Sequence, residues 1–204
     1  MVYILTLRLQ LQHKKNQMKK LFLFLGVFLF FVSCKKSETK SAINADEEIT
    51  QKINLLYKTY GKSNETIYNQ PIPDNLFYSD LKNTLEDAIN ASKADIEKVK
   101  KSDHPDEKPL IFEGAIFSSL YEGYTSYKIK SIDVMESTKP LGSQADVAVE
   151  FEYSHSSPKV IWTDKIHLIN AFDAGWRIDN IVFDTIGNSK DLKSRLTEFV
   201  QSTK

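Results

Sequence analysis

The chain has 204 residues, 41% of them hydrophobic and 26% charged, and its 27 basic and 27 acidic side chains leave no net charge. Residues 1–33 hold five basic side chains and no acidic one, so the remainder carries 27 − 5 = 22 basic and 27 acidic side chains, a net charge of −5. This balance argues against a nucleic-acid partner, because such proteins present a clustered basic surface. Cys34 is the only cysteine, which excludes an internal disulfide.

The segment before Cys34 has the three parts of a secretory signal. Met18-Lys19-Lys20 is a basic start, residues 21–32 are apolar apart from Gly26, and a small residue precedes the cysteine. The apolar run is shorter than the roughly 20 residues that a membrane-spanning helix needs. We therefore predict a signal peptide over residues 1–33, with either a true start at Met18 or an extended basic region before it.

The end of this segment, Phe31-Val32-Ser33-Cys34, resembles the lipobox of bacterial lipoproteins, with Phe31 for the usual Leu and Ser33 for the usual Gly or Ala. The resemblance implies acyl chains on Cys34 and attachment to a membrane of the cell envelope, facing the periplasm or the cell surface. The alternatives for Cys34 are a buried thiol or a short anchor that keeps its signal. Residues 34–44 are polar and predict a lipidated tether, and residues 45–204 have the length of a single domain.

Two helices are predicted at the start of this domain. Asn44 and Glu47 resemble a capping box, and Gly61 is expected to end the first helix. Apolar residues recur between them at helical spacing: Ile49, Ile53, Leu56, Tyr57 and Tyr60. Asp74 is the expected N-cap of the second helix, after two prolines. Its predicted inner face holds Phe77, Leu81, Leu85, Ala88, Ile89, Ser92, Ile96 and Val99.

Residues 110–123 fit neither a helix nor a strand pattern, and their conformation stays open. From Tyr124 the apolar period changes to two, which predicts four antiparallel strands separated by turn-rich stretches. Their alternating residues are Tyr127 and Ile129; Ala145 to Tyr153; Val160, Trp162, Ile166 and Leu168; and Trp176, Ile178 and Val182. A last helix is expected from about Asn188. The fold class is therefore α+β, with N-terminal helices packed on a curved four-stranded antiparallel sheet and a C-terminal helix.

This order of elements resembles the cystatin-like or nuclear-transport-factor-2-like cone. Three motifs also look like the uncharacterised DUF3828 family: Leu55-Leu56-Tyr57-Lys58-Thr59-Tyr60-Gly61, Trp162-Thr163-Asp164-Lys165 and Gly175-Trp176-Arg177-Ile178-Asp179-Asn180-Ile181. The resemblance covers roughly residues 47–200 and implies a cone fold and an exported lipoprotein, with no established activity. By analogy with cone domains, the sheet offers a dimerisation face that contains Ile181 and Phe183.

Asp164 is the one candidate catalytic residue. Alternation along its strand places it on the same face as Trp162, Ile166 and Leu168. A carboxylate on an apolar face must be hydrogen-bonded or have a raised pKa, and an Asp in a cone-shaped cavity serves as general base in ketosteroid isomerase. The alternative is a structural Asp164 near the strand end that pairs with Lys or Arg or accepts from a backbone amide.

A set of aromatic side chains is the candidate lining for an apolar ligand. Its members are Tyr57, Tyr60, Tyr121, Tyr124, Trp162 and Trp176. The alternative is that each of them is ordinary core, because aromatic side chains dominate the cores of small domains.

The remaining ionisable residues predict no cofactor and no metal. His104 beside Asp103 and Asp106 offers only a weak metal site, since a structural zinc needs a closed set of ligands. Glu113 and Glu122 flank an apolar stretch, and a glycosidase pair would need its carboxyl groups roughly 5–9 Å apart.

Taken together, these features predict a membrane-anchored lipoprotein whose domain is a non-enzymatic module for a protein partner or a small apolar ligand. The alternatives are a small-molecule enzyme with Asp164 as general base in an aromatic pocket, and an immunity or inhibitor protein that blocks an exported toxin or hydrolase. A filled cone with an exposed apolar patch would favour a protein partner.

Overall fold

The computed structural model describes residues 44–61, 67–68, 71–136, 142–171, 175–187 and 190–203. The predicted signal peptide, Cys34 and the tether as far as Ile43 lie outside these residues. The remaining tether residue, Asn44, immediately precedes the first described helix.

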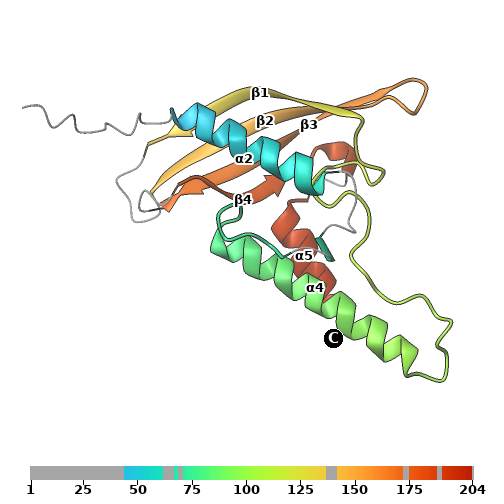
Figure 1. The fold of residues 1–204 in the computed structure, drawn as a ribbon. Coiled ribbons are helices and arrows are strands. Elements are labelled where there is room, and N and C mark those ends of the chain that lie inside the picture. Colours follow the sequence, from blue (N-terminus) through green and yellow to red (C-terminus); the bar gives the residue numbers. More distant parts are fainter. Residues whose placement is uncertain are drawn as a thin grey trace, which may run out of the picture. The chain divides into compact units, whose positions relative to one another are not determined.

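Of the elements within the described residues, two long helices precede the sheet and one helix follows it (Figure 1). The helices are α2 (Ala45–Tyr60), α4 (Ser79–Lys100) and α5 (Leu192–Ser202), and a short 3-10 helix, η3, covers Thr185–Gly187. The strands are β1 (Ser126–Met135), β2 (Ser143–Tyr153), β3 (Val160–Asn170) and β4 (Arg177–Val182), and they pair antiparallel in the order β1-β2-β3-β4. The predicted α+β class, with its curved four-stranded sheet, is confirmed.

Alternation along the central strands makes one face of the sheet apolar. On β2 the inward side chains are Ala145, Val147, Val149 and Phe151, and all four are buried. Helix α2 packs its buried stripe, which includes Ile53 and Leu56, against this face. The opposite face of β2 carries polar and charged residues apart from Ala148, which follows from the period of two.

Helix α2 begins and ends where the sequence predicts. The Asn44 side chain accepts a hydrogen bond from the Asp46 backbone N–H at 3.4 Å, and acidic residues fill the first turn. Gly61 follows the last helical residue, but its φ of −74° is not left-handed. A Cβ at Gly61 would clash with both the Tyr124 hydroxyl and the Tyr57 carbonyl oxygen, and these two close contacts are what require glycine here.

Helix α4 begins later than predicted, because the preceding segment pairs with the sheet. Phe77 forms an isolated parallel bridge with Ile178, whose backbone N–H donates to Leu76 and whose carbonyl accepts from Tyr78, both at 2.8 Å. The expected N-cap at Asp74 is therefore wrong, and Tyr78 occupies that position without a side-chain cap. Asp74 forms an ion pair with Lys82 instead.

Residues 110–123 contain no helix and no strand, which explains why neither pattern fits them. Side chains of α4 and of nearby segments accept hydrogen bonds from the backbone N–H groups of residues 110–123. The Leu110 N–H donates to Asp95 at 2.7 Å, and the Phe112 N–H donates to the Tyr68 hydroxyl at 3.0 Å. The backbone N–H groups of this irregular stretch are thus hydrogen-bonded to side chains and not to a neighbouring strand.

The C-terminal helix α5 begins at Leu192, four residues after the predicted start at Asn188, which lies outside the described residues. Asp191 is its N-cap and accepts from the Ser194 N–H at 3.0 Å. The expected dimerisation face is also wrong in its residues, because Ile181 is 0% and Phe183 only 5% exposed. The Arg195 guanidinium of α5 lies 4.8 Å from the centre of the Phe183 ring and helps to cover it.

Within the described part of the chain, no helix has both the length and the apolar character needed to cross a membrane.

Candidate functional site

Asp164 lies on the inward face of β3 and is 0% exposed. As predicted, it shares this face with Trp162, Ile166 and Leu168, and all three are buried. It does not lie at the strand end, since β3 extends four residues before it and six after it. Its side chain therefore enters the core between the sheet and residues 110–123.

Three separate segments supply hydrogen-bond donors to the Asp164 carboxylate. Its Oδ2 accepts from the Ser119 backbone N–H at 2.9 Å and from the Trp162 indole Nε1–H at 3.3 Å. Its Oδ1 accepts from the Ser119 hydroxyl and from the Asp184 backbone N–H at 3.0 Å. Four donors occupy about the four acceptor positions that a carboxylate has.

This environment sets the ionisation of Asp164 and limits its chemistry. Burial raises the pKa of its carboxyl above the usual 3.8, although the hydrogen bonds from Ser119, Asp184 and Trp162 oppose that rise. A general base needs a lone pair within hydrogen-bond reach of the proton that it removes. Because protein donors occupy both oxygens, the arrangement fits a carboxylate that ties β3 to residues 110–123 and to the stretch after β4.

Most of the candidate aromatic residues belong to the core and pack on each other. Tyr57, Tyr60, Trp162 and Trp176 are buried, and Tyr124 is half-buried. Ring centres are 5.7 Å apart for Tyr57 and Tyr124, and Phe151 stacks on Trp162 at 5.4 Å.

The aromatic candidates also do not converge on one place. The Trp176 backbone N–H donates to the Glu48 side chain in the first turn of α2, whereas Tyr60 is the last residue of that helix. At 1.5 Å per residue these positions are roughly 18 Å apart. Tyr121 is the exposed exception, at 59%, and its hydroxyl donates to Glu113. The structure brings Tyr57, Tyr124 and Trp162 together through Phe151 and leaves Tyr60, Tyr121 and Trp176 elsewhere.

The structure also shows where the weaker candidates for a metal site and for a pair of catalytic carboxylates lie. Among the described residues, no group of three or more His, Cys, Asp or Glu side chains could hold a metal ion, and His104 lies in an exposed turn. Glu113 forms an ion pair with Lys108 at 3.0 Å, and Glu122 is exposed. His167 on the outer face of β3 is hydrogen-bonded to Asp146 at 2.8 Å.

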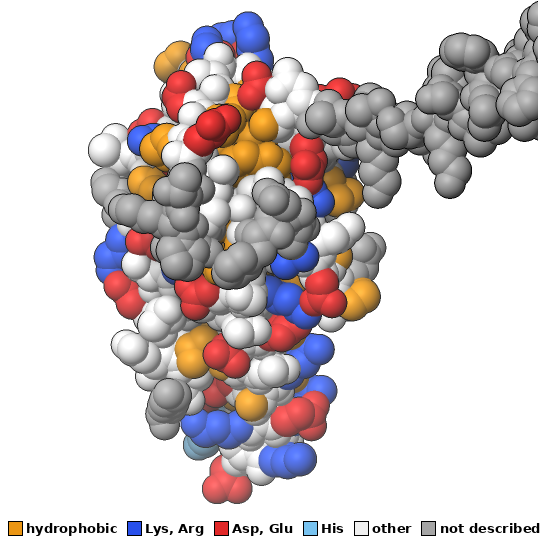
Figure 2. All heavy atoms as spheres, turned by 90° about the vertical axis from the view of Figure 1, so that its left-hand side faces the viewer, with side chains coloured by type: hydrophobic (Ala, Val, Ile, Leu, Met, Phe, Trp, Pro, Cys, Tyr) orange, Lys and Arg blue, Asp and Glu red, His pale blue; other side chains and the backbone are white. Residues whose placement is uncertain are grey.

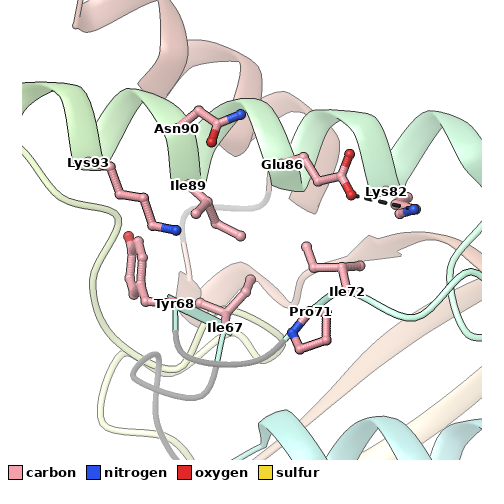
Figure 3. Close-up of a pocket in the computed structure, with 9 residues that line it drawn as sticks. All are labelled: Ile67, Tyr68, Pro71, Ile72, Lys82, Glu86, Ile89, Asn90 and Lys93. Atoms are coloured by element: carbon pink, nitrogen blue, oxygen red, sulfur yellow. Dashed lines mark ion pairs between the residues drawn. The ribbon is translucent and has the colours of Figure 1, made fainter.

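A groove of about 420 Å³ lies between α4 and the segment that precedes it (Figure 3). We call it the α4 groove. Its apolar lining consists of Ile67, Tyr68, Pro71, Ile72 and Ile89, and its polar lining consists of Lys82, Glu86, Asn90 and Lys93. The volume falls within the range of roughly 300–1,000 Å³ that is usual for small-molecule sites.

The sequence pattern of α4 contains half of this site. Lys82, Glu86, Asn90 and Lys93 follow one another at helical spacing beside the buried stripe, which by itself predicts only a solvated edge. What turns this edge into a groove is the segment with Ile67 and Ile72 on the facing side. No local pattern in the sequence indicates that packing.

Comparison with known proteins gives no relative for this chain: no family model, no curated protein and no solved structure matches it. The resemblance to DUF3828 and to lipoprotein signals therefore stays a prediction.

Proposed function

We propose that the protein is a lipid-anchored lipoprotein of the bacterial cell envelope whose domain, residues 45–204, is a non-enzymatic module that binds a small ligand in the α4 groove. The lipobox-like residues 31–34 and the signal-like segment before them support the anchor at Cys34. The observation that carries the binding role is the α4 groove, where a cavity of ligand size meets apolar and cationic side chains.

The groove is a better candidate than the aromatic core for two reasons. The acceptor positions of Asp164 are occupied by Ser119, Trp162 and Asp184, so a substrate proton has no free oxygen to approach. The aromatic side chains around it are buried against one another. Binding in that region would first have to displace well-packed core, which is costly.

Two exposed apolar residues of the sheet do not combine into a docking patch for a protein partner, which also favours a small ligand. Ile161 and Val182 are exposed on neighbouring strands, but Val182 pairs with Lys165, four residues along β3 from Ile161. That spacing is roughly 13 Å, so the two do not form one patch. The face in Figure 2 mixes acidic and basic side chains around a small apolar area. Scattered apolar residues are normal for a monomer surface.

The anchor is tested by fractionating bacteria that express the full chain or its Cys34→Ser variant. We expect the full chain in the membrane fraction with an N-terminal peptide that begins at Cys34 and carries acyl groups, because several chains make attachment lasting. Cys34→Ser should lose this modification. An unmodified Cys34 in a membrane-bound chain would contradict the lipid anchor.

The site is tested with the full chain in phosphatidylcholine nanodiscs, with isoleucine methyl groups labelled for NMR. The probe is 8-anilinonaphthalene-1-sulfonate, an amphipathic anion. We expect saturable shifts at Ile67, Ile72 and Ile89, which line the groove, and none at Ile166 and Ile178 in the sheet core. Shifts at the core methyl groups, or no saturable shift at all, would contradict the proposed site.

A further inference from the structure

The α4 groove differs in charge along its length. At one end, Lys82 forms ion pairs with Asp74 and with Glu86, the latter at 3.4 Å, and Figure 3 shows the Glu86 carboxylate turned toward Lys82. At the other end, Lys93 has no ion-pair partner among the described residues, and its ammonium group reaches down beside Tyr68. Among the described residues, one end of the groove is thus electrically compensated, and the other carries a cation without an ion-pair partner.

The described acids that follow Lys93 on α4 or lie beside Tyr68 are already engaged. Asp95, two residues further along, accepts the Leu110 N–H at 2.7 Å. Glu97, one turn further along α4, forms an ion pair with Lys100 at 2.9 Å. Glu113, which acts electrostatically on Tyr68, forms an ion pair with Lys108 at 3.0 Å. None of these described acids therefore neutralises the charge at Lys93.

Between the two ends the lining is apolar apart from Asn90 on α4. Ile67, Ile72 and Ile89 contribute aliphatic side chains that belong to the hydrophobic core cluster. The Tyr68 hydroxyl donates to the Phe112 carbonyl at 2.9 Å, which leaves its ring as the groove wall. An apolar floor that ends at a cation with no ion-pair partner in the described part of the chain suits a ligand with a short apolar part and one anionic head group.

We propose that the α4 groove binds a small amphipathic anion, such as a short-chain carboxylate, with its head group at Lys93 and its apolar part on Ile89 and Ile72. This inference rests on the groove being the ligand site. The cation supplies selectivity for charge, and the aliphatic floor supplies an apolar contact for the rest of the ligand. Because Lys93 is exposed, its contribution is that of a surface ion pair.

The test uses four probes on the full chain in phosphatidylcholine nanodiscs, followed through the methyl signals of Ile67, Ile72 and Ile89. The probes are octanoate, octan-1-ol, octyltrimethylammonium and acetate. We expect octanoate to bind about fivefold more tightly than octan-1-ol, a ratio in the range that one exposed ion pair supplies. Octyltrimethylammonium should bind more weakly than octan-1-ol, and acetate should cause no shift at the same concentrations.

Two lysine variants of α4 test whether the charge of Lys93 itself, and not any loss of charge on this helix, sets the preference for octanoate. Lys93→Gln should remove the preference for octanoate over octan-1-ol while both still bind. Lys98→Gln, which neutralises another exposed lysine of α4 outside the groove, should keep that preference. Equal binding of octanoate and octan-1-ol to the unaltered chain would overturn the anionic class and leave the groove intact as a site. Shifts with acetate alone would overturn the amphipathic requirement, and no shift with any probe would remove the groove itself.

Discussion

At the residue scale, the Asp164 carboxylate holds donors from positions 119, 162 and 184 in one buried cluster. Replacing Asp164 by Ala leaves the Ser119 N–H and the Trp162 indole N–H without an acceptor, and each unpaired buried group costs roughly 1–3 kcal/mol. We expect Asp164→Ala to lower the free energy of unfolding by about 3 kcal/mol in urea denaturation. Asp133→Ala on the outer face of β1, which removes an exposed carboxylate, is the control and should change little. Equal stability of the two variants would contradict the tying role of Asp164.

The pH dependence of stability tests whether burial or hydrogen bonding dominates at Asp164. Burial raises the folded-state pKa above the usual 3.8, so the folded chain binds a proton more readily than the unfolded chain. The stability of the unaltered chain relative to Asp164→Asn should therefore rise as the pH falls through the raised pKa, and level off below about 3.8. Urea unfolding of both proteins between neutral and acidic pH measures this difference. A relative stability that falls on acidification would mean that the donors outweigh the burial.

At the scale of single elements, the end of α2 depends on the contact between Gly61 and Tyr124. A Cβ at Gly61 would lie 1.7 Å from the Tyr124 hydroxyl, which itself donates to the Tyr57 carbonyl at 3.0 Å. We expect Gly61→Ala to lower the free energy of unfolding by about 1–3 kcal/mol, because added atoms must displace packed neighbours. Tyr124→Phe removes the nearest of the obstructing atoms and leaves the Tyr57 carbonyl oxygen in place, so the double variant should be moderately more stable than the sum of the single effects. Additive effects in this cycle would show that the contact does not matter.

The irregular residues 110–123 depend on acceptors from α4. Asp95 accepts the Leu110 N–H at 2.7 Å, and we expect Asp95→Ala to speed hydrogen exchange at that amide. Asp87→Ala, an exposed change on the same helix, is the control and should leave the exchange of Leu110 unaltered. Unchanged exchange in Asp95→Ala would mean that this stretch is held by other contacts.

The elements that the sequence predicts well are those with a periodic buried face. Strands β2 and β3 alternate because only one face of the sheet is covered, and α2 carries both a cap and an apolar stripe. The start of α4 could not be read in the same way. Phe77 continues the helical spacing, but its backbone lies in a bridge with Ile178, about 100 residues further along the chain.

At the scale of the whole molecule, the sequence indicates which side chains are unusual and gives little information about their partners. Period two correctly places Asp164 on the apolar face, yet its donors Ser119 and Asp184 lie 45 and 20 residues away. The α4 groove is even harder to predict from the sequence, because it forms only when Ile67 and Ile72 face Ile89. Both features arise from long-range packing between segments that carry no shared pattern.

The proposed protein combines a lipid anchor at Cys34 with a ligand site in the α4 groove. Native mass spectrometry of the full chain, released gently from bacterial membranes, tests both in one spectrum. We predict the mass of residues 34–204 with attached acyl chains, and a fraction that carries a small adduct. The adduct should be depleted in Lys93→Gln and retained in Lys98→Gln. An unprocessed, unacylated mass would contradict the anchor, and a mass that never carries an adduct, or an adduct indifferent to Lys93, would contradict the binding module.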